Sequence, residues 1–206
     1  VGVVTAVVLA DQGHVVIGVD IDKQKVELLS RGVSPIYEPG LEELLKKNHG
    51  KLRFIMDYGE LRDCEAVFIA VPTPTKPSGE IDLSYLFDAV QRLVNIGYRG
   101  IIAIKSTVIP GTARKVEEMT GLPVVSNPEF LREGSAVYDT LHPDRVVIGS
   151  RDKHAGDIVE EIWSFTKAPA IRTTPEVAEL IKYAANAFLA LKLSFINEIA
   201  NLCEKI

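Results

Sequence analysis

Residues 66–71 form an unbroken apolar run, and this run limits the possible folds more than any other part of the sequence. Apolar residues at every position indicate a strand covered on both faces, as in a parallel sheet with helices on each side. The run stops at Pro72 and Pro74, which have no N–H to donate to a sheet ladder. Thr73 and Thr75 at its carboxyl end would either present hydroxyls to a cofactor or simply belong to the segment that ends the strand.

Short apolar runs alternate with amphipathic segments along the chain, which predicts an α/β fold with a doubly wound, mostly parallel sheet. Expected strands are residues 14–20, 52–56, 66–71, 101–104, 122–125 and 144–149. Expected helices are residues 1–10, 22–32, 41–48, 83–96, 112–120, 154–166 and a long one from 176, with a helical turn at 58–62. Thr112 is a candidate helix cap. The boundary expected at 172–175 divides a domain of residues 1–172 from the long helix at 173–206.

The first 20 residues suggest the second half of a βαβ dinucleotide-binding unit of the Rossmann type. Gly2 would be the last fingerprint glycine, and Asp20 follows it by 18 residues at the end of an apolar run, where such folds place the acid that binds ribose hydroxyls. An acid there favours NAD over NADP. Lys25 could reach the same ribose or a phosphate, or lie on a solvated helix face. We expect the first strand and the opening glycines of this unit to be missing from these residues.

Residues 127–134 follow the expected strand at 122–125 and carry two acids, Glu129 and Glu133. Pro128 should end the strand, and chemistry in an open parallel sheet lies just beyond the carboxyl ends of its strands. If the segment is helical, the two carboxylates share one face. The alternative is a solvated helix start, since acids favour helix N-termini.

A helical pattern without Gly or Pro runs from Glu176 to Ile206, which corresponds to about 45 Å of helix. Helices of this length usually bridge domains or build subunit interfaces. Lys182 and Asn186 are four residues apart and share one face of it. They are equally compatible with a functional site and with an interface or solvated surface.

Composition excludes several classes of partner and site. The net charge is −5 and no run of Lys or Arg exceeds two, so we expect neither nucleic acid nor a membrane surface as a partner. The two cysteines, Cys64 and Cys203, have no metal-ligand spacing and fit a reducing compartment, so we expect no metal site. No apolar run approaches the ~20 residues needed to span a bilayer. We expect a cytoplasmic protein.

Several stretches in the right order resemble the UDP-glucose/GDP-mannose dehydrogenase family, whose members oxidise nucleotide sugars with NAD. They are residues 1–10, 19–20, 35–41, 71–75, 105–108, 127–134 and 182–190. The resemblance implies that Asp20 and Lys25 hold the adenosine ribose and that Thr73 and Thr107 line the NAD site. Thr107 would also help to place water, and Glu133 would lie near the nicotinamide.

The resemblance also implies a substrate site. Phe130, Leu131 and Glu133 would hold the sugar nucleotide, together with Glu129. Glu129 is expected to be the base that hydrolyses a cysteine thioester intermediate. Lys182 and Asn186 are expected to bind substrate and to stabilise the developing oxyanion, since a cation and an amide donor on one rigid face can be aimed at charge that appears in the transition state.

The implied activity is the two-step oxidation of UDP-glucose to UDP-glucuronate by a homodimer or larger homo-oligomer. The family's nucleophilic cysteine motif is absent, so we expect it outside these residues, and we expect the 206 residues alone to be inactive. Residues 142–145 favour UDP-glucose over GDP-mannose weakly; UDP-N-acetylmannosamine is a third candidate. Two further alternatives are a β-hydroxyacid dehydrogenase-like enzyme, which oxidises once, and a non-catalytic nucleotide-binding or dimerisation module.

Overall fold

The computed structural model describes residues 1–206 and contains seven strands in two sheets. The strands are β1 (Val16–Val19), β2 (Leu52–Ile55), β3 (Ala66–Ile69), β4 (Ile101–Ile104), β5 (Val124–Ser126), β6 (Val146–Ser150) and β7 (Ala170–Thr173). The α-helices are α1 (Gly2–Asp11), α2 (Lys23–Ser30), α3 (Leu41–Lys47), α4 (Ser84–Asn95), α5 (Thr112–Thr120), α6 (Ala136–Leu141), α7 (Lys153–Ile162) and α8 (Pro175–Cys203). Two short 3₁₀ helices, η1 (Tyr58–Leu61) and η2 (Ser164–Thr166), complete the fold. The alternation of apolar runs and amphipathic segments in the sequence predicted this α/β class correctly.

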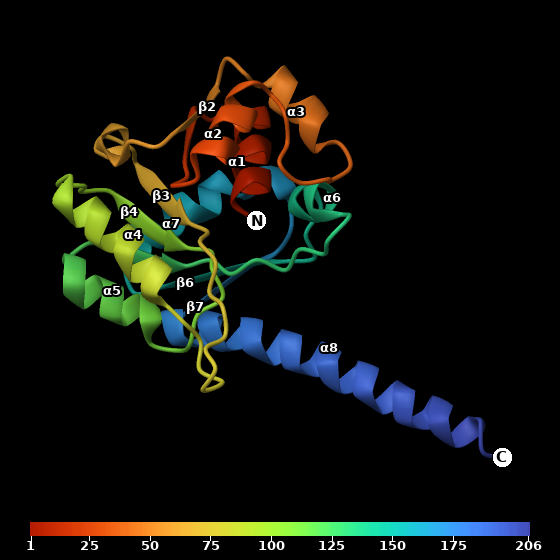
Figure 1. The fold of residues 1–206 in the computed structure, drawn as a ribbon. Helices are drawn as coiled ribbons and strands as arrows, with labels where there is room; N and C mark the ends of the chain where they lie inside the picture. The colour runs from red at the N-terminus through yellow and green to blue at the C-terminus, as the bar shows by residue number, and fades with distance from the viewer.

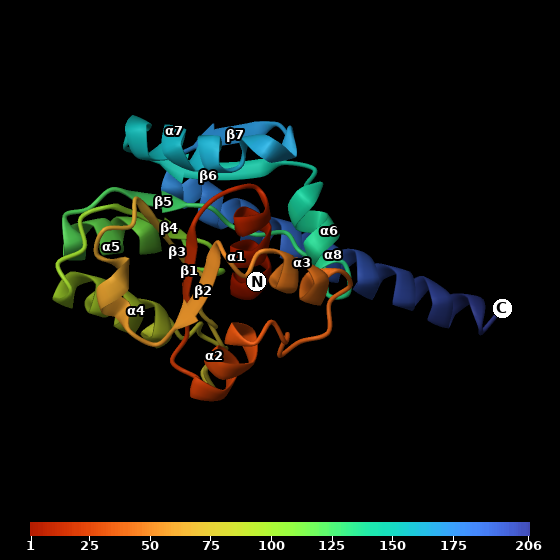
Figure 2. The ribbon, with the colours of Figure 1, turned by 90° about the horizontal axis from the view of Figure 1, so that it is seen from above.

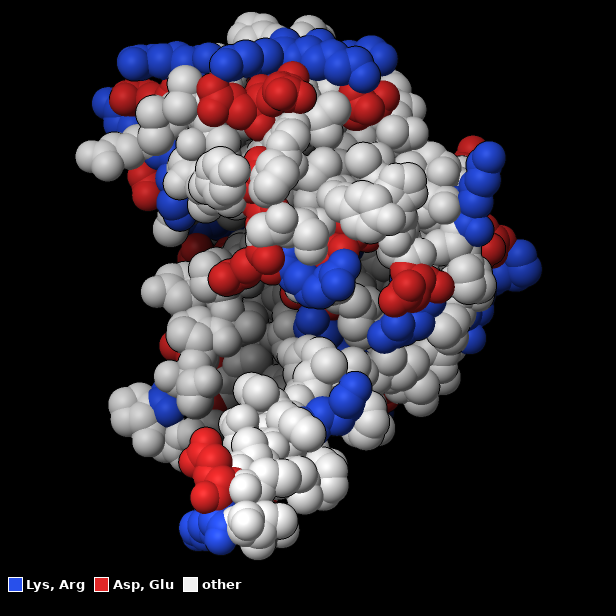
Figure 3. Space-filling model, turned by 90° about the vertical axis from the view of Figure 1, so that its right-hand side faces the viewer, with Lys and Arg blue, Asp and Glu red and all other residues white.

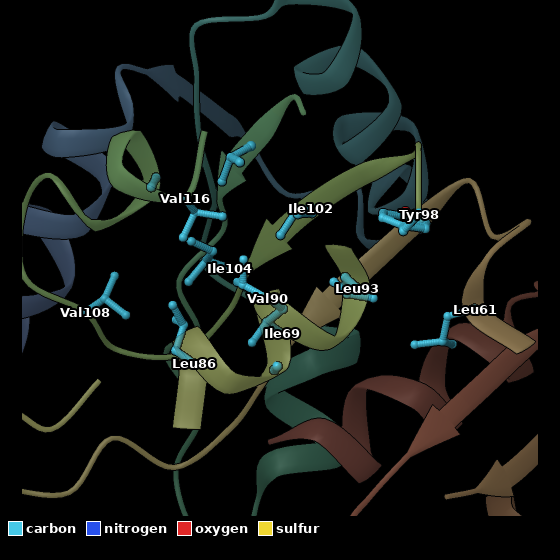
Figure 4. Packing of buried hydrophobic residues seen from close by; sticks show 13 residues of the cluster. Leu61, Ile69, Leu86, Val90, Leu93, Tyr98, Ile102, Ile104, Val108 and Val116 are labelled. Carbon is cyan, nitrogen blue, oxygen red and sulfur yellow. The ribbon is translucent and has the colours of Figure 1, made fainter. Parts of the chain in front are cut away.

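The larger sheet has the order β3-β4-β5-β6-β7 and is parallel except for the β5–β6 pair. Helices cover both of its faces, and α8 leaves the molecule as a long rod (Figures 1 and 2). Alternate residues of β4 point to opposite faces, as strand geometry requires. Ile102 and Ile104 pack with α4 and α5 (Figure 4), whereas Ile101 and Ala103 pack with α7 and Trp163. The sheet is therefore a buried central layer.

The smaller sheet pairs β1 with β2 in parallel, starting with Val16 opposite Leu52. Helices α1 and α3 pack together beside it in a second core cluster. No ladder joins β1 to β3, although Ile17 and Val19 pack against the main cluster. β3 is thus an edge strand of the larger sheet. For this reason Ala66, Val67 and Phe68 are only half-buried. The strand is nevertheless covered on both faces as expected: Val67 and Ile69 pack in the cluster of α4 and α5, whereas Ala66 and Phe68 pack in the cluster of α7.

Helix α8 is embedded in the domain only at its beginning. β6 and α8 approach each other so closely at Gly149 that a Cβ there would meet the Cβ of Ala178 at 2.5 Å and the Cα of Pro175 at 2.8 Å. After Asn186 every residue of the helix is exposed. Figure 3, which views the molecule from the side on which α8 projects, shows that this part carries few charges. Neither α8 nor any other helix is long and apolar enough to cross a membrane.

The structure differs from the sequence-based expectations at three places. Residues 170–173 form a strand, β7, that the sequence pattern did not indicate, because Arg172 and the threonines interrupt its apolar character. Thr112 does not cap α5: the cap position is Gly111, with a φ of +96°, and the Thr112 hydroxyl donates to the Ile109 carbonyl. Residues 127–132 are an irregular loop and residues 133–134 a turn, so the two acids of this segment do not share a helix face.

Candidate functional site

A cavity of about 670 Å³ lies where the carboxyl ends of β3 and β4 face α8. Thr73 lines it after β3, Thr107 after β4, and Tyr183 and Asn186 from α8. A short hairpin, in which Thr75 forms an antiparallel bridge with Ile81, closes another side. Residues that are far apart in the sequence therefore meet at the edge of the sheet where open α/β folds bind ligands. The predicted Thr73, Thr107 and Asn186 are brought together here.

A second cavity of about 290 Å³ adjoins the first at Thr73 and Thr107, which line both. Glu129 lies in its wall, as do Lys105 and Ser106. The Ser106 hydroxyl donates to the Val71 carbonyl at 2.7 Å, which ties the segment after β4 to the segment after β3. The next residue, Thr107, lines both cavities.

The carboxylate of Glu129 is held between a cation and a backbone amide. Lys182 Nζ donates to Glu129 Oε1 at 3.3 Å, and the Leu131 N–H donates to Oε2 at 2.6 Å. The Lys182 ammonium also lies 5.2 Å from the centre of the Phe130 ring. The opposite charges are thus paired across loop and helix, as buried charges must be. Sequence reasoning assigned both residues to one site, and the structure brings them into contact.

Two further carboxylates fix the loop that carries Glu129. Asp139 accepts hydrogen bonds from the Arg132 backbone N–H at 2.9 Å and from Arg132 Nη2 at 2.6 Å. These bonds lower the pKa of Asp139 to about 2. Glu38 accepts from the N–H groups of Gly134 and Ala136, at the start of α6. The loop is therefore anchored on both sides of its tip.

The start of α8 is fastened to the start of α5. Glu179 is 2% exposed, and its carboxylate accepts hydrogen bonds from the Gly111 N–H at 2.6 Å and the Ala113 N–H at 2.7 Å. No side chain of α5 caps its own N-terminus, so Glu179 supplies the acceptor that the free N–H groups need. Burial raises the pKa of this carboxyl. One turn later the same helix presents Lys182 to Glu129.

Four residues in the site were not predicted, and each had a signal in the sequence. Lys105 directly follows four apolar residues, a place where a charged side chain is unusual. Glu38 lies within a Pro- and Gly-rich stretch, where a polar residue can serve as a distant cap. Asp139 and Glu179 lie within apolar helix faces, which is where buried acids need a partner.

The other predicted residues do not line these two cavities. Asp20 follows β1 and accepts the Asp22 N–H at 2.9 Å. The Lys25 ammonium lies 3.9 Å from the Asp22 carboxylate on the surface of α2. Gly2 begins α1, and Glu133 is exposed at the tip of the loop. The structure thus separates the environments of Glu129 and Glu133.

The chain's own groups fit a dinucleotide. Helix α1 has no side-chain cap, and the residue before it, Val1, lines the smaller cavity. Free N–H groups at a helix start bind phosphate. Asp20 offers a carboxylate for ribose hydroxyls at the end of β1, and Thr73 and Thr107 offer hydroxyls. No group of three or more His, Cys, Asp or Glu side chains is arranged to hold a metal ion.

Comparison with known families identifies this fold and cavity. Residues 1–167 match the NAD binding domain of the UDP-glucose/GDP-mannose dehydrogenase family. The chain belongs to this family. Residues 176–206 match the family's central domain. The predicted Rossmann-like fold, the family resemblance and the NAD cofactor are confirmed.

Individual relatives agree with the family. UDP-glucose 6-dehydrogenase YwqF of Bacillus subtilis is 45% identical over all of this chain and 50% of its own length. A UDP-glucose dehydrogenase structure from Pyrobaculum islandicum is 44% identical with a TM-score of 0.90, covering 96% of this chain and 49% of that one. A GDP-mannose dehydrogenase structure from Pseudomonas aeruginosa is 40% identical with a TM-score of 0.90, covering 96% and 50%. This family member spans about half the length of these relatives.

Proposed function

We propose that this chain supplies the NAD site and part of the catalytic site of an enzyme that oxidises UDP-glucose to UDP-glucuronate in two steps. The observation that carries the proposal is the contact between Lys182 and Glu129 at 3.3 Å, beside the cavity lined by Thr107 and Asn186. A single alcohol oxidation needs no second carboxylate base. A carboxylate next to a cation and an amide donor suits hydrolysis of an acyl intermediate.

In this proposal Glu129 takes a proton from the water that attacks a thioester carbonyl. Lys182 and Asn186 donate to the oxygen that becomes negative, and the cysteine that carries the acyl group lies outside these 206 residues. Thr107 orients the water from the end of β4. Phe130, whose ring lies 4.3 Å from the Arg145 guanidinium carbon, and its neighbour Leu131 shape the side where the sugar nucleotide binds.

The cofactor would be held by residues that surround the strand ends. Bound NAD supplies the hydride acceptor for each oxidation. Asp20 would bind its ribose hydroxyls, with Lys25 nearby, and the start of α1 at Gly2 would face the phosphates. Thr73 would contact the cofactor after β3. Glu133 would complete the nicotinamide side, where it also contacts the sugar nucleotide.

The choice of UDP-glucose is supported by relatives of this name at 45% and 44% identity. GDP-mannose is the second candidate, since GDP-mannose 6-dehydrogenase of Pseudomonas aeruginosa is 41% identical over the whole chain. We expect residues 142–145 to discriminate between the two sugar nucleotides, because Arg145 in this segment contacts the ring of Phe130.

The partner that we propose for the projecting half of α8 is a second copy of this chain. The projecting half of α8 comprises residues 187–203, and its large apolar side chains are exposed. Leu189, Leu193 and Phe195, for example, are 63%, 63% and 64% exposed. A helix with apolar side chains on several faces is unstable as a solvated rod and becomes stable when packed. Two copies of one helix form such packing by a two-fold axis.

The decisive experiment is Glu129→Gln in the full-length protein. The variant should carry out the first oxidation but release acid about a hundredfold or more slowly, because a neutral amide cannot accept the proton of the attacking water. A covalent acyl adduct should then appear in the mass of the denatured protein. Glu118→Gln, at an exposed position on α5 that is remote from the cavities, is the matched control and should behave as wild type.

Turnover is measured with UDP-glucose, GDP-mannose and UDP-N-acetylmannosamine. Two NADH per UDP-glucose with little turnover of the others is the expected result. One NADH per substrate and no adduct in Glu129→Gln would instead indicate a single-oxidation dehydrogenase. If none of the substrates yields NADH, the remaining interpretation is a non-catalytic nucleotide-binding module.

A further inference from the structure

The ring of Phe130 is approached by two cations that come from different parts of the chain. The Lys182 ammonium, on α8, lies 5.2 Å from the centre of the ring, and the guanidinium carbon of Arg145 lies 4.3 Å from it. A cation within about 6 Å of the ring centre is attracted to the negative face of an aromatic ring. The ring therefore joins α8 to the segment before β6, at the loop that carries Glu129.

Lys182 is a buried cation with a small set of partners. It is 7% exposed, and its ammonium donates to Glu129 Oε1 at 3.3 Å. An ammonium carries three N–H donors, so this hydrogen bond leaves two of them for other partners. A buried cation also needs compensation for the hydration that it loses on folding. The carboxylate of Glu129 and the ring of Phe130 supply this compensation together.

These two partners hold the ammonium in different ways. The hydrogen bond to Glu129 fixes the direction of one N–H, because hydrogen bonds weaken steeply when they are bent. The attraction to a ring face is electrostatic and requires no particular N–H to point at the ring. The ammonium of Lys182 can therefore leave the carboxylate and turn to another acceptor while the ring still holds it. An ion pair alone would provide no such hold.

We propose that Phe130 is a positioning residue that acts through Lys182: its ring keeps the ammonium in place while the hydrogen bond passes from Glu129 to the oxyanion. This role rests on the hydrolytic function proposed above. Water attacks the acyl carbon and its proton passes to Glu129. The carbonyl electron pair moves to oxygen, to which Lys182 donates, then returns as the carbon–sulfur bond breaks and the thiolate leaves. Arg145 holds the ring and gains or loses no proton in these steps.

The test replaces Phe130 in the full-length enzyme by phenylalanines that carry one, two or three ring fluorines. Fluorine nearly preserves the shape of the ring but withdraws negative charge from its face, which weakens the attraction for a cation. The rate of acid release should fall stepwise, by about tenfold at three fluorines. Acyl adduct should accumulate in the same order. The first hydride transfer, followed in a single turnover at saturating substrate, should stay within about threefold of wild type.

Three controls separate this role from packing. Phe130→Tyr keeps a ring face and should release acid within about threefold of the wild-type rate. In a Lys182→Met background the fluorine series should change acid release by less than about twofold, since the group through which the ring acts is gone. The same series at Phe54, a half-buried ring of β2 outside the two cavities, should have no effect. Thermal unfolding of each variant shows whether it is folded under assay conditions.

The outcomes that overturn the proposal differ from those that overturn the function. A rate of acid release that stays constant across the fluorine series at Phe130 excludes the role, because the shape of the ring is then sufficient. A series that keeps its slope in the Lys182→Met background, or that slows the first hydride transfer equally, excludes it as well. A wild-type enzyme that forms neither acid nor adduct from any of the sugar nucleotides removes the hydrolytic function itself, and the role of Phe130 with it.

Discussion

At the scale of single residues, the cavity contains a side chain that makes the protein less stable. Lys105 has a pKa of about 8 in the folded protein, against 10.5 for an ordinary lysine. Its protonated form is therefore disfavoured by folding, on the order of 3 kcal/mol at neutral pH. Such features persist in proteins mainly where function requires them.

This imbalance predicts a difference between wild type and Lys105→Met in the free energy of unfolding. Between pH 8 and 10.5 the unfolded chain binds a proton at this lysine that the folded chain has released. The wild type should therefore gain stability relative to the variant as pH rises through this window, and below pH 8 the variant should be the more stable one. Urea unfolding at pH 7, 9 and 10.5 measures the difference.

The stability of wild type must be compared with that of Lys105→Met because other groups titrate in the same pH range. Burial also raises the pKa values of Tyr58 and Tyr98, and these tyrosines are present in both proteins. A constant difference in stability between the two proteins from pH 7 to 10.5 would show that burial does not lower the pKa of Lys105.

At the scale of elements, the position of α8 depends on its first two turns. Gly149 allows β6 to approach the helix, and Glu179 joins it to the N-terminus of α5. Arg151 adds ion pairs to Glu117 on α5 and to Glu176 on α8. These contacts set the rotation of the helix, and with it the direction in which Lys182 points.

Glu179→Ala should lower the free energy of unfolding by about 2 to 4 kcal/mol, because it leaves the buried Ala113 N–H and the half-buried Gly111 N–H without an acceptor. Amide hydrogen exchange at Gly111 and Ala113 should accelerate more than at α4. Glu198→Ala, in the exposed part of the same helix, should change stability by less than about 0.5 kcal/mol. Equal effects of the two substitutions would show that the buried carboxylate does not hold α8 in place.

Local pattern predicts most elements correctly, and the exceptions have a common cause. The strand at 101–104 and the end of the helix at Thr120 were predicted to the residue, because their apolar positions match their own period. β7 was missed because its residues look like a polar loop, and pairing with β6 decides their conformation. Residues 127–134 were ambiguous for the same reason. Their path is set by Glu38 and Asp139, which lie elsewhere in the sequence.

The candidate site shows the same contrast between what the local sequence predicts and what tertiary contacts decide. Family resemblance located Thr107, Glu129, Lys182 and Asn186, and the end of the strand at 66–71 located Thr73. What the sequence could not show was contact: the pairing of Glu129 with Lys182 joins residues 53 positions apart. Lys105 was overlooked although it follows four apolar residues, because Trp163 and the cavity beside it come together only in the assembled fold.

At the scale of the whole molecule, the projecting half of α8 predicts self-association. Leu193→Glu places a charge on the exposed apolar surface and should shift the full-length protein toward monomer at micromolar concentration. Sedimentation velocity over a concentration series measures this. Glu118→Lys, an exposed change of charge on α5 outside this surface, is the control and should leave the assembly intact. A wild-type protein that is monomeric at every concentration contradicts the proposed partner.

The shape of α8 also has a mechanical consequence. Its anchored part ends near Lys182, and about 21 residues extend beyond, a lever of roughly 30 Å. A tilt of about 10° around the anchor would move the far end by roughly 5 Å but Asn186 by only about 1 Å. Movements of whatever packs on the far end therefore reach the cavity reduced about fivefold, so the pair of side chains on α8 is shielded from the motions of its neighbours.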